Sequence, residues 1–283
     1  MITIQNELLS ATISTHGAEL RSLTFNTLEY IYPSMEQIWK NSSPLLFPIT
    51  GSVKNDTYTH KGACYQIAKH GFARDSIFTV IEHTDTRAVF RLQDNAQTLA
   101  QYPFHFTLNV TYELSGNTLR VGYTVSNESD EVMYFSIGAH EGYYTPEGIE
   151  DYDVIFDEAV TLDATTLLGP YVTDLRTRIL ANSRTLPLYD KYFVTDALVF
   201  ENISCRALTL RNRKTEKSVH ISFPFAKNLL LWHMPSSPYI CIEPWAGIPD
   251  RLGSGTELCE KEDIMALAVG ETYYGEHTIT ILS

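Results

Sequence analysis

The hydrophobic residues of this 283-residue chain recur mostly at every second position, the spacing of a β-strand with one buried face. The clearest case runs from Phe106 to Val125. Apolar and polar side chains alternate up to Leu114 and again from Leu119 onward, with a Ser-Gly-Asn segment between the two runs. Two alternating runs joined by a short turn that contains Gly and Asn predict a β-hairpin.

Other short apolar or alternating runs predict further strands, at residues 78–81, 88–92, 219–223, 239–242 and 278–281. Helical signals are few, with about two turns each expected over residues 94–101 and 261–268. Helical crossovers between strands, which an α/β fold needs, are missing from the pattern. The chain is therefore predicted to be all-β, a sandwich or barrel with few short helices. Since no linker or repeat interrupts it, we expect a single domain over residues 1–283.

Composition narrows the function classes. The chain has 21 Lys and Arg against 34 Asp and Glu, a formal net charge of −13, which disfavours a nucleic-acid partner. A hydrophobic share of 44% excludes intrinsic disorder, and no apolar stretch is long enough to predict a transmembrane helix, so no membrane partner is expected. The N-terminus lacks the pattern of a signal peptide, which predicts a cytoplasmic protein.

Motifs for cofactors and metals are missing from the sequence. There is no Gly-x-Gly-x-x-Gly segment, no P-loop and no Gly-x-Ser-x-Gly elbow. The nine histidines form no His-x-His or His-x-x-x-His pair, and the cysteines at positions 64, 205, 241 and 259 are scattered. We therefore expect no cofactor, no metal, and reduced thiols that are mostly buried.

Two segments place a histidine beside glycine. His70 and Arg74 flank Gly-Phe-Ala just before a predicted strand, and His140 follows an apolar run that starts near Met133. Glycines bracket His140, and glycine lets a backbone approach a ligand closely. Each segment also has a structural explanation, as an exposed charge pair in a loop or as a structural histidine at a strand end.

A third segment carries a carboxylate. Glu243 lies at the end of a predicted strand, which Pro244 is expected to stop because proline cannot donate to the ladder. A buried carboxylate is costly unless it is paired or used, so Glu243 is either salt-bridged or functional. Trp245 offers a flat apolar face that suits stacking against a sugar ring. Asp196 is a weaker candidate, because turn residues often lead into a strand in this way.

Together with Ser-Pro-Leu-Leu-Phe-Pro at residues 43–48 and Tyr-Pro-Phe at 102–104, these segments resemble the aldose 1-epimerases (galactose mutarotases) in content and order. The shorter bacterial branch associated with lactose and galactose operons is most similar. The resemblance covers essentially the whole chain. It implies a β-supersandwich with a sugar cleft on a concave sheet face, and an isomerase that acts on a small-molecule sugar as a monomer or homodimer.

The resemblance also implies roles for individual residues. His140 corresponds to the general acid that protonates the sugar's ring oxygen, and Glu243 to the general base that takes the proton of the C1 hydroxyl. His70 corresponds to a second histidine that binds near the ring oxygen. Asp196 corresponds to an acidic residue that holds sugar hydroxyls, and Arg74 to a sugar or site-ordering contact.

Two departures from the family pattern bear on the site. The family often has an arginine where Ser52 follows Gly51, and whether Lys54 replaces it is open. The family usually has proline after the catalytic histidine, where this chain has Glu141. If the Glu141 carboxylate lies close to His140, we expect it to raise the pKa of that histidine.

The preferred interpretation is an aldose 1-epimerase that interconverts anomers of a free aldohexose, such as galactose or glucose, by acid and base catalysis. One alternative is the same chemistry on a hexose 6-phosphate, whose related branch shares the His-Gly-Phe-Ala-Arg stretch. Phosphate favours clustered Arg or Lys, and the missing arginine and the acidic charge count against it. The other alternative is a non-catalytic carbohydrate-binding protein.

Overall fold

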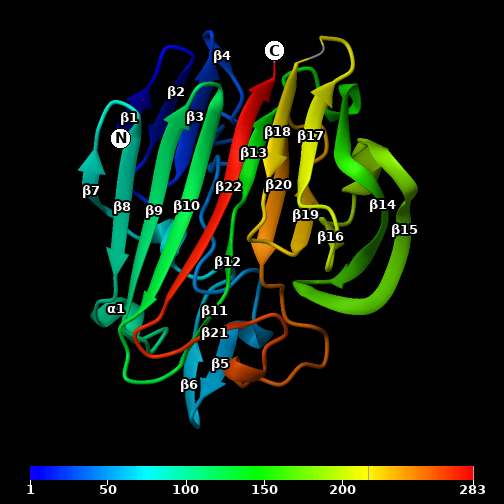
Figure 1. The fold of residues 1–283 in the computed structure, drawn as a ribbon. Coiled ribbons are helices and arrows are strands. Elements are labelled where there is room, and N and C mark those ends of the chain that lie inside the picture. Colours follow the sequence, from blue (N-terminus) through cyan, green and yellow to red (C-terminus); the bar gives the residue numbers. More distant parts are fainter. Residues whose placement is uncertain (216, 283) are drawn as a thin grey trace.

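A computed structural model describes residues 1–215 and 217–282, and strands make up most of it (Figure 1). Fourteen strands of this described part form one antiparallel sheet. In sheet order they are β12 (Ile137–Gly138), β20 (Tyr239–Ala246), β19 (Asn228–Trp232), β16 (Leu198–Phe200), β14 (Tyr152–Leu168), β17 (Ala207–Asn212), β18 (Ser218–Ser222), β22 (Thr272–Leu282), β10 (Thr118–Asn127), β9 (Phe106–Ser115), β8 (Arg87–Gln93) and β7 (Thr79–His83), with β13 (Glu141–Tyr144) on β20 and β15 (Tyr171–Pro187) on β14.

Smaller sheets and short helices complete the described structure. A four-stranded sheet packs against β8 and β9, and it consists of β1 (Ile2–Gln5), β2 (Leu9–Ile13), β3 (Leu20–Phe25) and β4 (Leu28–Glu29). Two hairpin-sized sheets pair β5 (Thr57–His60) with β6 (Ala63–Gln66) and β11 (Met133–Phe135) with β21 (Met265–Leu267). The helices are α1 (Ala96–Leu99) and the 3-10 turns η1 (Lys54–Asp56), η2 (Ala73–Asp75), η3 (Ile149–Asp151), η4 (Asp190–Tyr192) and η5 (Leu258–Glu260).

The all-β prediction is confirmed, and so is the hairpin. β9 and β10 pair in antiparallel register with Leu114 opposite Leu119. Every second residue of β10 is buried, as the alternation predicted, and the apolar ones, Leu119, Val121, Tyr123 and Val125, join a hydrophobic core that extends from Ile4 to Ile281. The other predicted strands correspond to β7, β8, β18, β20 and β22. No helix of the described residues is both long and apolar enough to cross a bilayer.

One predicted helix is confirmed, although with four residues it is shorter than the two turns expected, and the other is wrong. Residues 94–101 contain α1, whose start Asn95 caps by accepting the backbone N–H groups of Gln97 and Thr98. Residues 261–268 contain β21, which pairs with β11. Lys261 is buried there, with its Nζ 2.7 Å from Asp250 Oδ1. This tertiary pairing outweighs the local helix propensity of the segment.

The cysteine prediction is half right. All four cysteines are free thiols, but only Cys205 and Cys241 are buried, whereas Cys64 and Cys259 are exposed.

Candidate active site

β16, β19 and β20 lie side by side toward one end of the large sheet (Figure 1). A cleft of about 390 Å³ opens over these strands. Its volume is that of a small-molecule site. The six site residues predicted from sequence all line it, and they are His70, Arg74, His140, Asp196, Glu243 and Trp245. A larger groove of about 540 Å³ lies over β10 and β22, but the Arg120–Glu276 ion pair lines it and it contains none of the six.

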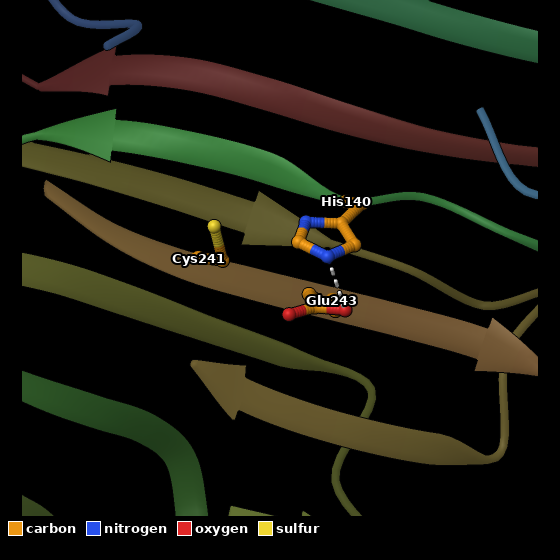
Figure 2. Close-up of side chains that lie close together, drawn as sticks. All are labelled: His140, Cys241 and Glu243. Atoms are coloured by element: carbon orange, nitrogen blue, oxygen red, sulfur yellow. Dashed lines mark ion pairs between the residues drawn. The ribbon is translucent and has the colours of Figure 1, made fainter. Parts of the chain in front are cut away.

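Strand register places His140 opposite Glu243. β12 and β13 both pair with β20, with Gly138 opposite Trp245 and Glu141 opposite Ile242. β12 and β13 have the same register against β20. His140, which lies between these two strands, is therefore opposite Glu243 of β20. Side chains directly opposite each other in an antiparallel pair are in contact range. His140 Nε2 accordingly lies 3.3 Å from Glu243 Oε2 (Figure 2).

Pro244 does not end its strand, contrary to the sequence prediction. β20 continues through it to Ala246, because proline removes one donor and keeps its acceptor. The backbone N–H of Ala139 donates to Pro244 O at 3.1 Å. A residue other than proline at position 244 would donate its backbone N–H to the carbonyl of Ala139. That carbonyl accepts instead from Trp245 Nε1 at 3.1 Å. Pro244 thus helps to fix the Trp245 indole beside His140 and Glu243.

The glycines on either side of His140 make room for tryptophan rings. A Cβ on Gly138 would lie 2.6 Å from Trp245 Cδ1, and one on Gly142 would lie 2.8 Å from Trp39 Cζ3. Both distances are shorter than any van der Waals contact. The two glycines therefore let indoles flank His140, a use different from the close backbone approach to a ligand that the sequence predicted.

Burial shifts the two facing groups in opposite directions. The Glu243 side chain is 2% exposed and the His140 side chain 12% exposed. Loss of water raises the pKa of Glu243 well above its ordinary value, while Lys69 lowers it and Glu141 and Asp196 raise it further. Loss of water also lowers the pKa of His140 to about 3, and Lys69 and Arg74 add to this effect. Both shifts favour the uncharged form of each group.

Glu141 does not act on His140 as predicted. Its carboxylate is buried on the other side of the strand, with Oε1 3.2 Å from Nε2 of His277. The prediction of a raised pKa for His140 is therefore wrong, because burial dominates and lowers it. Adjacent residues of a strand point to opposite faces, which is why sequence adjacency misled here. Glu141 instead contributes to the raised pKa of Glu243.

His70 is held in one orientation by the backbone of Gly51. The N–H of His70 donates to Gly51 O at 2.7 Å, and the N–H of Gly51 donates to His70 Nδ1 at 3.1 Å. Burial lowers the pKa of His70 well below its ordinary value, so its ring is neutral and carries its proton on Nε2. The ring lies between two cleft rings, with centroids 5.8 Å from His140 and 5.5 Å from Trp245.

Lys69, Arg74 and Asp196 are the more exposed charged residues that line the cleft. Arg74 donates to Lys69 O at 3.1 Å, and both side chains line the cleft. Asp196 lies two residues before β16 and accepts the backbone N–H of Ala197 at 2.7 Å through Oδ1. Lys54 does not replace the missing arginine, because its Nζ points to Ser254 O at 3.4 Å and it is outside the cleft lining.

Comparison with known proteins identifies the family. The family described as aldose 1-epimerase matches residues 1–280. The chain belongs to the aldose 1-epimerase family. Protein LacX of Lactococcus lactis subsp. lactis, in both its plasmid and chromosomal forms, is 32% identical over 297 residues, covering 100% of this chain and 99% of the relative.

Solved structures show the same fold as this aldose 1-epimerase family member. A galactose mutarotase related enzyme from Lactobacillus acidophilus superposes with a TM-score of 0.93 at 34% identity, over 99% of this chain and 97% of that one. A galactose mutarotase-like protein from Lactobacillus casei ATCC 334 gives a TM-score of 0.94 at 29% identity, with 100% of both chains covered. The fold predicted from the sequence resemblance is therefore confirmed.

Sequence reasoning missed three cleft residues of this family member. Trp39 and Trp232 line the cleft, with their ring centroids 5.4 and 5.9 Å from that of His140, and Lys69 lies beside His70. The tryptophans carried a signal, because the chain has only three and all three line the cleft. Lys69 carried none, since a lysine before a histidine in a loop is ordinary surface sequence.

The same floor holds a set of potential metal ligands. One donor atom each from His140, Cys241 and Glu243 lies within 4.8 Å of the other two. Figure 2 shows Cys241 and Glu243 on β20 and His140 on the neighbouring chain segment. Cys241 precedes Glu243 by two residues and so projects from the same face of the strand.

Proposed function

We propose that the protein is a mutarotase that interconverts the α and β anomers of a free aldohexose such as galactose or glucose. The observation that carries this proposal is the contact between His140 and Glu243 on the floor of a cleft of sugar-binding size. Membership of the aldose 1-epimerase family supports the same reaction class.

The reaction needs one proton to leave the sugar and one to enter it. In the proposed ring opening, the Glu243 carboxylate takes the proton of the C1 hydroxyl while protonated His140 gives a proton to the ring oxygen. The C1–O5 bond breaks and an aldehyde forms at C1. After rotation about C1–C2, the aldehyde oxygen takes the proton from Glu243, and neutral His140 takes back the proton of the C5 hydroxyl.

Burial of the pair favours the forward proton transfers. After ring opening the proton has moved, through the sugar, from His140 to Glu243, so both groups are neutral. The raised pKa of Glu243 and the lowered pKa of His140 stabilise this neutral pair. The same burial raises the free energy of the charged pair that begins the step, which is the Glu243 carboxylate and protonated His140. Because this pair starts higher in free energy, it transfers its proton more readily. The open-chain intermediate is therefore the state that this site stabilises.

The remaining predicted residues are proposed to position the sugar. His70 presents an Nε2–H donor toward the cleft beside His140, which suits an acceptor such as the ring oxygen. One carboxylate oxygen of Asp196 accepts the backbone N–H of Ala197, which leaves the other oxygen to accept from sugar hydroxyls. Trp245 is 2% exposed and fixed by its hydrogen bond to Ala139, so it offers a rigid apolar edge.

Substitution of the base tests the proposal. Glu243→Gln keeps the shape and removes the carboxylate, and we expect kcat for mutarotation to fall by about 10²–10⁴-fold while sugar still binds. Polarimetry on freshly dissolved α-glucose and α-galactose measures the rate. Glu276→Gln, on the separate groove over β22, is the matched control and should keep full activity. Full activity of the Glu243 variant would contradict the assignment, and sugar binding without catalysis by the wild type would support the non-catalytic alternative.

A hexose 6-phosphate is the second candidate substrate, favoured by two cations of the cleft. Lys69 and Arg74 both line the cleft, and charged donors of this kind bind phosphate. If phosphate is recognised, glucose 6-phosphate should be turned over with a higher kcat/KM than galactose. In that case Lys69→Gln should lose about tenfold in kcat/KM on the phosphate ester only. An equal loss on both sugars would exclude a phosphate contact at Lys69.

A further inference from the structure

Cys241 has no role in the proposed acid–base reaction, although it lies beside the pair that performs it. Its thiol is fully buried on β20, where it faces Trp232 across one strand pair and Gly142 across the other. A buried free cysteine is usually an apolar packing residue. Cys241 differs from an ordinary packing cysteine because it shares a strand face with Glu243 and lies next to His140 (Figure 2).

The three side chains offer the donor atoms that zinc binds. Zinc accepts imidazole nitrogen, thiolate sulfur and carboxylate oxygen, with bond lengths that place neighbouring ligand atoms about 3.3–3.7 Å apart in a tetrahedron. His140 Nε2 and Glu243 Oε2 are already 3.3 Å apart, and the donor atoms of all three residues lie within 4.8 Å of one another. Zinc binding therefore requires the three donor atoms to move closer together from these separations.

Two further observations point to a ligand here. In the part of the chain that the structure describes, this is the one group of three or more His, Cys, Asp or Glu side chains with donor atoms this close. The site also has an open side, because His140 and Glu243 line the cleft. Three protein ligands with one open position is the arrangement of catalytic zinc sites.

Charge balance favours a divalent cation. A thiolate and a carboxylate together carry two negative charges, which one Zn²⁺ neutralises, so the filled site has no net charge to bury. Binding displaces the thiol proton of Cys241, and any proton on Glu243, to the solvent. Mg²⁺ and Ca²⁺ prefer oxygen ligands and do not suit a sulfur and a nitrogen donor.

We propose that His140, Cys241 and Glu243 bind one Zn²⁺ ion on the floor of the cleft, in competition with the sugar. The competition follows from geometry, because the ion occupies the two groups that the ring opening uses. This second half rests on the proposed mutarotase function, whereas the metal site itself does not.

Zinc binding is measured first, without sugar. The parent protein is Cys64→Ser/Cys259→Ser, which removes the two exposed thiols. Isothermal titration with Zn²⁺ should show one tight site. Cys241→Ser should weaken it by more than about 100-fold, since loss of groups that only support metal ligands costs 10–100-fold. Cys205→Ser is the matched control, a buried thiol that donates to Ala207 O, and it should leave the affinity unchanged.

Cobalt reports the ligands directly. Co²⁺ added to the parent should give the thiolate-to-metal charge-transfer band and the intense visible bands of a tetrahedral site. The charge-transfer band should vanish in Cys241→Ser and Cys241→Ala, and persist in Cys205→Ser. Absence of the band in the parent, or equal Zn²⁺ affinity in the parent and Cys241→Ser, overturns the proposal. Circular dichroism of each variant shows whether a lost signal reflects unfolding, and His140→Gln gives an independent ligand deletion.

Inhibition is measured second. If the parent is a mutarotase, Zn²⁺ should inhibit it competitively with sugar, and Cys241→Ser should keep its activity while losing the inhibition. Zinc binding in a protein that does not accelerate mutarotation would contradict the proposed function and leave the metal site standing. Inhibition that is unchanged in Cys241→Ser would contradict the metal site and leave the mutarotase standing.

Discussion

At the scale of single residues, the proposed chemistry depends on one proton shared by Glu243 and His140. Glu243 and His140 are both common residue types, and their ordinary pKa values place a charged carboxylate beside a partly protonated imidazole. Burial reverses that preference by raising the pKa of Glu243 and lowering that of His140. In the proposed reaction the pair carries a single proton, and moving it from Glu243 to His140 forms the charged pair that burial disfavours.

The pH dependence of mutarotation follows from these shifts. The pair gains a second proton as the pH falls through the pKa of His140, and it loses its only proton as the pH rises through the raised pKa of Glu243. We therefore expect the acid limb of the kcat/KM profile near pH 3, well below the ordinary histidine value of 6.5. Polarimetry across pH measures it, and an acid limb near 6.5 would contradict the assignment.

We expect the charge of Lys69, which lines the cleft, to set the position of the same pH–rate profile. Its positive charge lowers the pKa of both Glu243 and His140. Lys69→Gln should therefore move both limbs of the pH–rate profile to higher pH. Lys54→Gln is the matched control, because that lysine is hydrogen-bonded to Ser254 outside the cleft lining, and it should leave both limbs in place. Unmoved limbs in the Lys69 variant would show that its charge is screened from the pair.

At the scale of elements, loops and strand register place these residues. His140 reaches Glu243 because β12 and β13 pair with β20 in one register. His70 instead depends on a tight loop in which both it and Gly71 have a φ of +71°. Few L-residues adopt that conformation at low cost, and Gly71 leaves no room for a side chain. The loop is thus specified by its glycine.

Substitution of that glycine tests the loop. In Gly71→Ala the added Cβ would lie 2.3 Å from Phe47 O, a backbone atom that cannot rotate away. We expect the free energy of unfolding to fall by about 2–4 kcal/mol and KM for sugar to rise as His70 shifts. Gly62→Ala is the matched control, with a φ of +80° and nothing within 4 Å of the added Cβ, and should cost about 1 kcal/mol with KM unchanged. Urea unfolding and polarimetry measure both, and equal losses would exclude the Phe47 contact as the cause.

At the scale of the whole molecule, one sheet connects the cleft to the opposite edge. The fourteen-stranded sheet extends from β12 beside the site to β7, and the main hydrophobic core includes residues from Ile4 to Ile281. The sheet is continuous along this length, and although side chains of the cleft form two smaller hydrophobic clusters, Ile240, Ile242 and Ala246 of β20 belong to the main core. Unfolding the cleft end therefore exposes core side chains of the remainder.

This continuity predicts one cooperative unfolding transition, as expected of a single domain over residues 1–283. Tryptophan fluorescence reports the cleft, since all three tryptophans line it, whereas far-ultraviolet circular dichroism reports the strands throughout. The two signals should give the same urea midpoint within experimental error. Separate midpoints would show that the cleft end and the β7–β10 end unfold independently and would contradict the single-domain prediction.

Several features of this protein could be predicted from the sequence because they are local. The period-two alternation of β9 and β10 depends only on which face of a strand is buried, and the turn between them on Gly and Asn. The predicted helix over residues 261–268 failed because pairing of β21 with β11 is not a local property. Pro244 was misjudged for the same reason, since its carbonyl finds a donor in a distant segment.

The sequence by itself determined the all-β class, the hairpin and, through resemblance to a family, the six residues that line the cleft. Only the tertiary structure decided how they lie relative to one another. It brought His140 into contact with Glu243, turned Glu141 away toward His277, and placed Cys241 beside the pair. The physical reason is that strand register and burial depend on contacts between distant parts of the chain, and these contacts set the distances and the pKa values on which the chemistry depends.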